Sequence, residues 1–248
     1  MRDICTDLGI SLPKLQKEFD KIIIAEGVQC TAPFDAISIE IDAVFFGREY
    51  VYFCFHDKTK VIYFAEIKTE TVADLRKGLL AIKQAGFKIK SITIDGRRGF
   101  YEAIKNILGN VPIQMCIFHQ KAIIRRYITN KPKSDCGREL KELMKNILQA
   151  NQQFINDFHK LKEKYKPFLN ERNNKGDFAH QQLRAAFRSL ETNLYKIFTY
   201  SDMPYLKIPN TNNHLEGMFS HIKEKINIHR GLSKSRKKNA IKFILKFH

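Results

Sequence analysis

Three acidic residues lie far apart in the sequence, and each stands where an expected element ends or begins. Asp42 closes the alternating run 37–42 and Asp95 closes the apolar run 91–95, whereas Glu216 lies at the start of a helical pattern. Carboxylates that are brought together repel one another and lose solvation, so a fold keeps them close mainly by binding cations. Mg²⁺ and Mn²⁺ prefer such oxygen ligands and act on phosphates. The three residues therefore predict a divalent-metal site that works on phosphate groups.

The charge of the chain indicates which phosphates such a site would meet. The 248 residues include 43 Lys and Arg against 26 Asp and Glu, a formal net charge of +17. A strongly basic chain attracts polyanions, so an acidic metal site within it favours phosphoryl transfer on nucleic acid. The apolar content of 44% suffices for a sizeable core in one large domain, or in one domain with a small appendage.

Nothing in the sequence directs the chain to a membrane. No apolar run approaches the roughly 20 residues that a membrane span needs, and residues 1–20 are amphipathic, unlike a signal peptide. The five cysteines are odd in number and no two stand close in the sequence, which favours reduced thiols. We therefore expect a soluble cytoplasmic protein without disulfide bonds.

Residues 37–128 predict alternating strands and helices. Three β-rich runs with short polar connections indicate an antiparallel meander. A helical spacing follows, in which Thr71 and Asp74 are placed for a capping box. The expected order is strand, strand, strand, helix, strand, helix, strand, helix. The ranges are 37–46, 50–56, 60–67, 88–95 and 111–115 for the strands, and 71–85, 99–108 and 118–128 for the helices.

The first 32 residues contain helix-breaking and helix-capping residues in the pattern of a helix-turn-helix. Gly9 would break one short helix, Ser11 would cap the next, and Pro13 is tolerated in the first turn of a helix. A DNA-binding helix pair and an ordinary helical hairpin both fit this short pattern. Pro33 and its polar neighbours predict a linker to the rest of the chain.

From Ser134 to Phe198 the β-rich runs stop, and apolar residues recur at helical spacing. Three helical faces are expected to form the core of an all-helical subdomain. They consist of Leu140, Leu143, Met144 and Ile147, of Phe154, Phe158, Leu161 and Tyr165, and of Leu183, Phe187, Leu190 and Leu194.

The helix that carries Glu216 has an apolar stripe and a polar side. Glu216 lies on the polar side, so we expect it to face a metal and not the core. Residues 211–248 hold nine Lys and Arg against two Glu and are expected to lie along phosphates, with a solvated basic helix as the alternative. The stripe consists of Leu215, Met218, Phe219, Ile222 and Ile226.

Four short motifs occur in a fixed order. They are Ile41-Asp42, Thr93-Ile94-Asp95-Gly96, Cys116-Ile117-Phe118-His119 and Asn210-Thr-Asn-Asn-His-Leu-Glu216-Gly-Met. Together with the order of elements, they resemble the DDE transposases and retroviral integrases, and look most like bacterial insertion-sequence transposases related to the Mutator-like group. The resemblance spans residue 37 to the C-terminus.

This resemblance implies an α/β fold, with a ribonuclease-H-like mixed sheet, an all-helical insertion and a short N-terminal helix-turn-helix-like segment. Residues 1–32 would be the DNA-binding fragment and linker, and 33–130 the first part of the core. Residues 131–210 would be the insertion. Residues 211–248 would form the catalytic helix of the core and a basic C-terminal helix.

The resemblance also implies a function, that of a DNA transposase which cleaves element ends and joins them to target DNA. Asp42, Asp95 and Glu216 would be the catalytic residues and would bind two Mg²⁺ or Mn²⁺ ions, with Asp42 shared, for two-metal phosphoryl transfer. Cys116 and His119 would support the pocket or contact DNA. The partners would be terminal inverted repeats and target DNA, held by a homodimer or a higher oligomer.

Basic residues in and near these motifs are the expected DNA contacts. His214 and His221, near Glu216, are further candidates for DNA contact or proton transfer. The basic residues are Arg97, Arg98, Lys121, Arg125, Arg126, Lys223, Arg230, Lys234, Arg236, Lys237 and Lys238.

Each acid also has a purely structural interpretation. Asp95-Gly96 is a common turn pair, and Asn213 and Glu216 have the spacing of a capping box. Glu40 is two residues before Asp42, so it shares that strand face and is a substitute or accessory ligand to consider.

Cys116 and His119 have the spacing of half a tetrahedral zinc site if the chain is helical there. No other close pair of Cys and His completes such a site. A packing cysteine with an ordinary histidine is the remaining alternative to a supporting role.

Two other functions fit parts of the sequence. A ribonuclease H or a junction resolvase would share the fold but would need neither the helical insertion nor the basic tail. A transposase remnant that only binds DNA is the second, because transposases of the resembled group usually carry a fuller N-terminal DNA-binding region, often with zinc.

Overall fold

The computed structural model describes residues 9, 11–148, 151–228 and 231–247. They include a six-stranded mixed sheet with the strand order β1-β4-β3-β2-β5-β6. Their contacts divide the chain into two compact units. Unit 1 comprises residues 1–35, 42–88 and 213–248, and unit 2 comprises residues 36–41 and 89–212. Strand β2 (Ile37–Phe46) passes from unit 2 to unit 1 between Ile41 and Asp42.

Unit 1 contains the antiparallel strands. β3 (Tyr50–His56) pairs with β4 (Val61–Ile67), with Cys54 opposite Phe64, and the short β1 (Gly27–Val28) pairs with β4. The predicted strands are confirmed to within one residue, because alternating apolar side chains and short polar turns mark them clearly. Strand β1 was not predicted, since two residues give no periodic signal.

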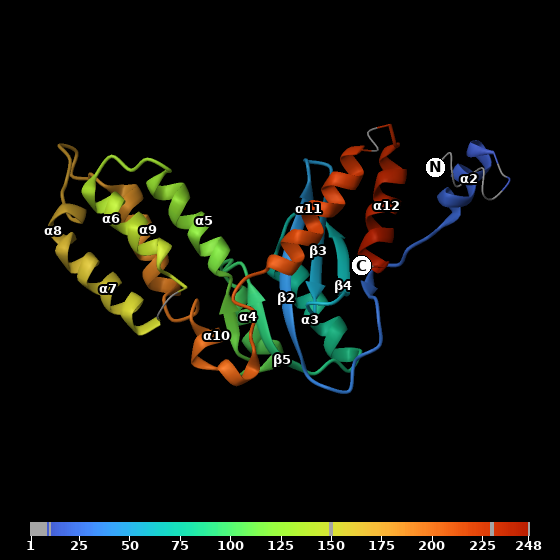
Figure 1. Ribbon diagram of the computed structural model, residues 1–248, viewed down its shortest axis with the longest axis horizontal. Helices are drawn as coiled ribbons and strands as arrows, with labels where there is room; N and C mark the ends of the chain where they lie inside the picture. The colour runs from blue at the N-terminus through green and yellow to red at the C-terminus, as the bar shows by residue number, and fades with distance from the viewer. Residues whose placement is uncertain (1–8, 10, 149–150, 229–230, 248) are drawn as a thin grey trace. The chain divides into compact units, whose positions relative to one another are not determined.

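Helices cover both faces of these strands (Figure 1). α3 (Val72–Gln84) packs on the face that carries Phe55. α11 (Asn213–Ile228) and α12 (Lys234–Phe247) pack on the face that carries Cys54. Successive strand residues point to opposite faces, so the fully buried run of β3 serves two cores.

Helix α3 begins with the predicted capping box. The Thr71 hydroxyl oxygen accepts a hydrogen bond from the Asp74 backbone N–H at 3.1 Å and the hydroxyl donates to the Asp74 carboxylate. This pair satisfies one of the N–H groups that a helix start leaves without a partner in the helix.

Unit 2 contains the parallel strands. β5 (Ile89–Ile94) pairs in parallel with the first part of β2, where Glu40 lies opposite Thr93, and with β6 (Ile113–Met115) on its other side. The predicted helices after β5 and β6 are confirmed as α4 and α5 (Figure 1). Their ranges are Phe100–Leu108 and Ile117–Ile128.

The predicted helical subdomain is present in unit 2 (Figure 1). Helices α6, α7 and α9 pack with α5 around one apolar core, and all twelve residues of the three predicted faces belong to this core or pack against it. The chain then returns through two short helices. The ranges are α6 Asp135–Lys145, α7 Asn151–Lys164, α8 Lys166–Leu169, α9 Gln181–Asn193, α10 Thr199–Asp202 and the 3₁₀ helix η1 Pro204–Leu206.

The end of the helical subdomain is fixed to β6 by a buried amide. The Gln114 side chain is fully buried, donates to the Ile197 carbonyl at 2.8 Å and accepts from the Tyr200 N–H at 2.9 Å. The Met115 N–H also donates to the Lys196 carbonyl at 2.9 Å. These bonds hold residues 196–200 against the edge of the parallel strands.

Residues 209–212, which we call the connecting segment, lead from the helical subdomain to α11. The Thr93 hydroxyl of β5 donates to the Pro209 carbonyl at 2.7 Å, and the Ile117 N–H of α5 donates to the Asn210 carbonyl at 3.0 Å. The segment is therefore bonded both to a strand and to the start of a helix.

Asn212 makes the third and fourth attachments of the connecting segment. Its side chain is fully buried and donates from Nδ2 to the Ile41 carbonyl at 3.2 Å, and its backbone N–H donates to the Cys116 sulfur at 3.4 Å. Ile41 is the residue before Asp42. The chain that enters α11 is thus bonded to the strand that leads into Asp42.

The N-terminal segment agrees with the prediction as far as it is described. α2 (Leu12–Lys21) follows Ser11 and has Pro13 in its first turn, although the Ser11 side chain makes no capping hydrogen bond. The predicted preceding helix falls on residues 1–8 and 10, which lie outside the described residues. None of the described helices is long and apolar enough to cross a membrane.

Replacement of Asn212 tests the connecting segment. Asn212→Ala leaves the buried Ile41 carbonyl without this donor, so we expect it to lower the free energy of unfolding by about 1–3 kcal/mol in urea denaturation. The control is Asn213→Ala at the adjacent, exposed position, with an expected change within about 0.5 kcal/mol. Equal effects of the two substitutions would contradict a structural role for the Asn212 amide.

Two helical glycines provide a second test. A Cβ at Gly78 of α3 would lie 2.5 Å from Cζ of the buried Phe55, so Gly78→Ala should destabilise the protein by about 1–3 kcal/mol in spite of the better helix propensity of alanine. Gly217 of α11 has no atom within 4 Å of its Cβ position, so Gly217→Ala should stabilise by about 0.5–1 kcal/mol. Thermal unfolding of both variants gives the comparison, and a stabilising Gly78→Ala would show that α3 does not pack this closely.

Candidate active site

The predicted acids are divided between the two units. Asp42 and Glu216 belong to unit 1, and Asp95 belongs to unit 2. Glu40, the accessory candidate, lies in unit 2 and is fully buried.

Asp42 lies at the border of the sheet core in unit 1. It is 9% exposed, and its Oδ1 accepts a hydrogen bond from the Ala43 N–H at 2.8 Å. Val44 shares its strand face and packs in one core with Cys54 of β3 and Leu215 of α11. Asp42 therefore projects from the face of the sheet that α11 covers.

The charge of Asp42 affects the pKa of the neighbouring Cys54. Burial raises the pKa of the Cys54 thiol well above its ordinary value, and the negative charge of Asp42 raises it further. The thiol stays protonated at neutral pH, so Asp42 has a neutral neighbour on β3. Such an inert thiol is a packing group and not a nucleophile.

Two histidines, His56 of β3 and His214 of α11, lie on the elements that pack together on this face of the sheet. His56 was not predicted from the sequence. His56 follows Cys54 by two residues on β3, is 3% exposed, and accepts a hydrogen bond on Nδ1 from the Lys58 N–H at 3.0 Å. Its ring stacks on that of His214 in α11, with centroids 6.4 Å apart. The signal in the sequence was its alternation with Cys54, which places it on the face toward α11.

Glu216 lies half-buried in the first turn of α11. A carboxylate there is stabilised by the partial positive charge of the helix N-terminus. α11 begins at Asn213, so Asn213 is inside the helix and not at the N-cap position that a capping box with Glu216 requires. The start of α11 at Asn213 therefore does not favour the capping-box interpretation, which stays a prediction. The predicted apolar stripe is confirmed, since Leu215, Met218, Phe219 and Ile222 are buried and Ile226 packs against them.

Asp95 is half-buried and follows β5 in a tight turn. Its Oδ1 accepts a hydrogen bond from the Arg97 N–H at 3.0 Å, so the turn interpretation of Asp95-Gly96 has geometric support. Gly96 has φ of +80°, and a Cβ there would lie 2.5 Å from the Met115 sulfur. Only glycine fits this turn without strain, and the turn sets the direction of the Asp95 side chain.

Cys116 and His119 lie at the start of α5 in unit 2. Cys116 is fully buried, and in addition to the Asn212 bond its N–H donates to the Ile94 carbonyl at 2.7 Å. His119 is half-buried, with the Phe118 ring edge-on at 6.0 Å. Cys116 thus joins the connecting segment to the strand end that leads into Asp95, which fits a supporting role.

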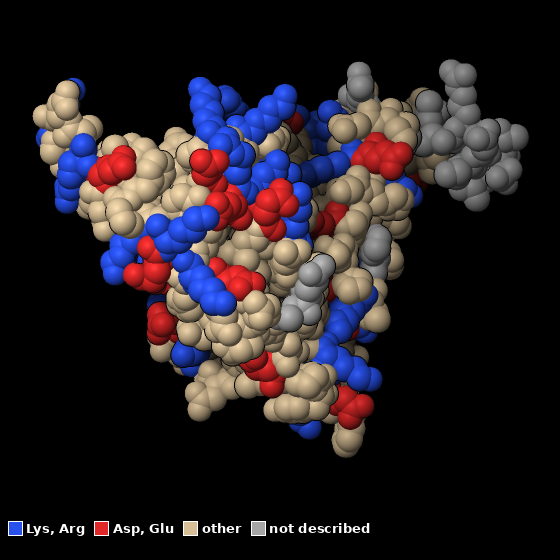
Figure 2. Space-filling view, turned by 60° about the vertical axis from the view of Figure 1, so that its left-hand side comes forward, with Lys and Arg blue, Asp and Glu red and all other residues tan. Residues whose placement is uncertain are grey.

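The basic residues predicted to bind DNA occur in both units. Figure 2 shows lysine and arginine side chains spread over the face in view, with acidic side chains among them. Arg97, Arg98, Arg125, Arg126 and Lys223 are exposed, Lys121 and Lys237 are half-buried, and Arg230 lies outside the described residues.

Helix α12 carries cations that pair with acids distant in sequence. Arg236 donates to both carboxylate oxygens of Asp20, at 2.8 and 2.7 Å, and holds the pKa of Asp20 below its ordinary value. Lys238 pairs with Glu66, and Lys234 pairs with Glu49 at 3.0 Å. Few acidic residues lie near these cations in the sequence. The fold brings acidic residues from distant segments beside them.

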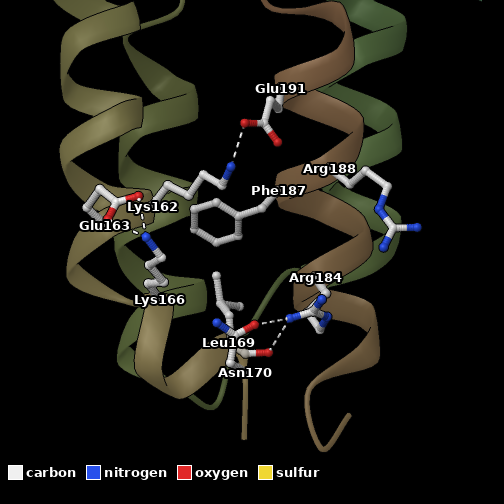
Figure 3. A pocket seen from close by; sticks show the side chains of 9 residues that line it. All are labelled: Lys162, Glu163, Lys166, Leu169, Asn170, Arg184, Phe187, Arg188 and Glu191. Carbon is white, nitrogen blue, oxygen red and sulfur yellow. Dashed lines mark hydrogen bonds and ion pairs between the residues drawn. The ribbon is translucent and has the colours of Figure 1, made fainter. Parts of the chain in front are cut away.

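A cavity of about 290 Å³ lies between α7, α8 and α9 in the helical subdomain (Figure 3). Its cations are largely matched by nearby acceptors. Lys162 pairs with Glu191, and Arg184 donates to the Leu169 carbonyl at 2.7 Å. Arg188 is the exception, since its guanidinium makes no ion pair within the described part of the chain. The cavity is therefore mainly a space between helices whose polar side chains bond to neighbouring groups of the bundle.

Comparison with known proteins finds similar solved structures and a family. The chain is similar to a chain of the cryo-EM structure of the simian T-cell lymphotropic virus intasome in complex with PP2A regulatory subunit B56 gamma, at 13% identity and a TM-score of 0.27. The similarity covers 76% of this chain and 63% of that chain, so this chain spans less than two thirds of the viral one. At that TM-score the likeness carries no conclusion about function. No curated protein matches the sequence.

The family model described as "Transposase, Mutator family" matches residues 65–238. This range contains Asp95, Cys116, His119 and Glu216, together with the helical subdomain, while Asp42 precedes it. The match covers well over half of the chain, and the chain therefore belongs to the Mutator family of transposases.

Proposed function

We propose that this protein cleaves DNA at the ends of a mobile element and transfers the cut strand into target DNA. The observation that carries the proposal is the connecting segment. It bonds to Ile41, the residue before Asp42, and to Thr93, two residues before Asp95, and it leads into the helix that carries Glu216. One short piece of chain thus bonds to both strands that lead to a predicted catalytic aspartate.

The sheet supports a ribonuclease-H-like core for this activity. Glu40 and Thr93 lie opposite each other in the parallel ladder, and two residues later the strands reach Asp42 and Asp95. The acids therefore follow the same step of one ladder. In the strand order, β2 lies between the β3–β4 hairpin and the parallel pair β5 and β6, which supports the mixed sheet expected of this fold.

Asp42, Asp95 and Glu216 would hold Mg²⁺ or Mn²⁺, two ions per site. Carboxylate oxygens are the ligands that these ions prefer, and Asp42 is buried enough for its charge to favour a cation nearby. When bound, the ions would activate the attacking water or 3′-hydroxyl and stabilise the leaving oxygen. The protonated Cys54 thiol would not compete as a ligand.

The other residues would bind and orient DNA. Exposed cations such as Arg98 and Arg125 would bind phosphates, and His214 would contact DNA or exchange a proton beside Glu216. Strand transfer replaces one phosphodiester bond with another, so no nucleotide cofactor is needed. The substrates would be terminal inverted repeats and target DNA in the cytoplasm, with a second protomer holding the second end.

Substitution of the three acids tests the metal site. Asp42→Asn, Asp95→Asn and Glu216→Gln keep the side-chain shape but remove the charge, so each should abolish Mg²⁺-dependent nicking of DNA that carries the element ends. Stability without metal should hold or rise slightly, because repulsion is relieved, while the thermal stabilisation by Mg²⁺ should shrink. DNA binding should persist.

The control is Glu224→Gln, an exposed acid on the same helix as Glu216, which should change none of these properties. A residue that serves only as a turn or cap would behave differently and cost about 1 kcal/mol with or without metal. Retained cleavage in a folded variant would remove that residue from the site, and Glu40 would be the first replacement to test for Asp42.

The ion pair between Asp20 and Arg236 gives a test of the basic helix. If Arg236 contacts a phosphate, DNA must displace the Asp20 carboxylate, so Asp20→Asn should tighten DNA binding. Arg236→Ala should weaken DNA binding and make the slope of log K against log salt less steep by about 0.9. Fluorescence anisotropy over a salt series measures both. No change in either variant would limit Arg236 to holding α2.

A further inference from the structure

Another cavity in unit 2, which we call the α4–α9 cleft, lies beside Asp95. It has a volume of about 500 Å³, and both neighbours of Asp95, Ile94 and Gly96, line it. One wall is the turn and first residues of α4, from Gly96 to Glu102, and the other is the α9 face with Arg188 and Thr192. The helical subdomain thus forms one side of a cleft that opens next to a predicted catalytic acid.

The cleft is positively charged. Arg97, Arg98, Arg188 and Lys196 line it, against the single acid Glu102. Within the described part of the chain, Arg98 and Arg188 make no ion pair, unlike the cations of α12. The Ser189 hydroxyl and the Asn193 amide also line it, whereas the Thr192 hydroxyl donates to the Arg188 carbonyl at 2.8 Å. Cations together with neutral donors are the groups that bind phosphodiesters.

The α9 wall is held in place from behind. The Asn193 side chain donates to Gln120 of α5 at 2.9 Å, and Gln120 is fully buried. The Lys196 carbonyl accepts the Met115 N–H of β6 at 2.9 Å. The cations of the helical subdomain are thereby fixed relative to the strand that ends at Asp95, and a ligand would meet a preformed site.

We propose that the α4–α9 cleft binds the single DNA strand that flanks the scissile phosphate, with Arg98, Arg188 and Lys196 as its phosphate contacts. The proposal rests on the proposed function, since it assigns the helical subdomain to the same DNA. It makes α9 a DNA-binding element, although none of its residues was among the predicted contacts.

The cleft favours a single strand held by its backbone. A volume of about 500 Å³ lies in the range of small-ligand sites and does not admit a duplex. Two aromatic residues, Tyr101 and Tyr127, line the cleft. The Tyr127 ring packs against the apolar core of the helical subdomain. The Tyr101 ring already has the Lys105 and Lys196 ammonium groups 4.9 and 4.7 Å from its centroid. An engaged ring is a poor platform for base stacking, so binding should not depend on sequence.

The experiment compares two fluorescein-labelled DNA hairpins of arbitrary sequence, one blunt and one with a short single-stranded flank. Binding of the full chain is measured by anisotropy over a salt series in EDTA, so that cleavage plays no part. For the native protein the slope of log K against log salt should be steeper for the flanked hairpin, with roughly 0.7 per added phosphate contact. In the double variant Arg188→Gln/Lys196→Gln, the difference in slope between the flanked and the blunt hairpin should fall by about 1.4, while binding of the blunt hairpin is unchanged.

Matched variants make the outcome specific. Lys160→Gln/Lys175→Gln removes two exposed cations of the same unit outside the cleft and should keep the difference. Arg188→Lys/Lys196→Arg retains the charges and should also keep it, which separates lost charge from a fold defect. Equal slopes for the two hairpins in the native protein, or a difference that survives in Arg188→Gln/Lys196→Gln, would overturn the proposal. Native protein that nicks DNA with Mg²⁺ but has equal slopes would remove the cleft alone, whereas a slope difference without any nicking would remove the proposed catalysis alone.

Discussion

Buried backbone groups must find hydrogen-bond partners, and in unit 2 this requirement links segments that are far apart in sequence. The connecting segment supplies acceptors for Thr93 and Ile117 and a donor for Ile41. Four attachments within a few residues leave little freedom for the chain that enters α11. A catalytic site needs its groups held to within about half an ångström, and loops rarely achieve this unless they are bonded on several sides. The connecting segment is a loop by its backbone but is fixed like an element of the sheet.

Charge is arranged in two different ways in this protein. Beside Asp42 the fold places a protonated thiol and, two residues further along β3, a histidine whose Nδ1 already accepts a backbone N–H. Along α12, by contrast, acids accompany the cations, so part of the positive charge of this helix is neutralised within unit 1. The cations of the α4–α9 cleft have fewer such partners. A net charge computed from sequence therefore overstates some basic surfaces and understates others, and only the pairing in space decides which can bind a polyanion.

Much of the fold could be predicted from sequence, because its signals are local. Alternation in β2 and β3 and the twelve apolar positions of the helical subdomain needed only neighbouring residues. The same is true of the capping box at Thr71. The capping box proposed for Asn213 and Glu216 depends on the first residue of α11, which local sequence signals do not fix to a single position.

The parts of the site that escaped prediction depend on contacts between distant residues. The role of Asn212, the stacking of His56 on His214 and the partner of Arg236 each join positions that are more than 150 residues apart. Neither composition nor periodicity carries such information. The choice of Asp42, Asp95 and Glu216 rested on the order of short motifs, and their role as metal ligands stays a prediction.

The hydrogen bond from Asn212 to the Ile41 carbonyl has a consequence for biosynthesis. It spans 171 residues, and that from Thr93 to Pro209 spans 116. Helices of the subdomain rest on local contacts and can form while the chain is still emerging, whereas these long-range bonds must wait, because closing large loops is slow and needs both ends. A nascent chain that stops before residue 212 would have β2, the strand that carries Asp42, but not the hydrogen bond from Asn212 to it. An incomplete chain of this kind would therefore lack the bond that attaches the connecting segment to the strand carrying Asp42.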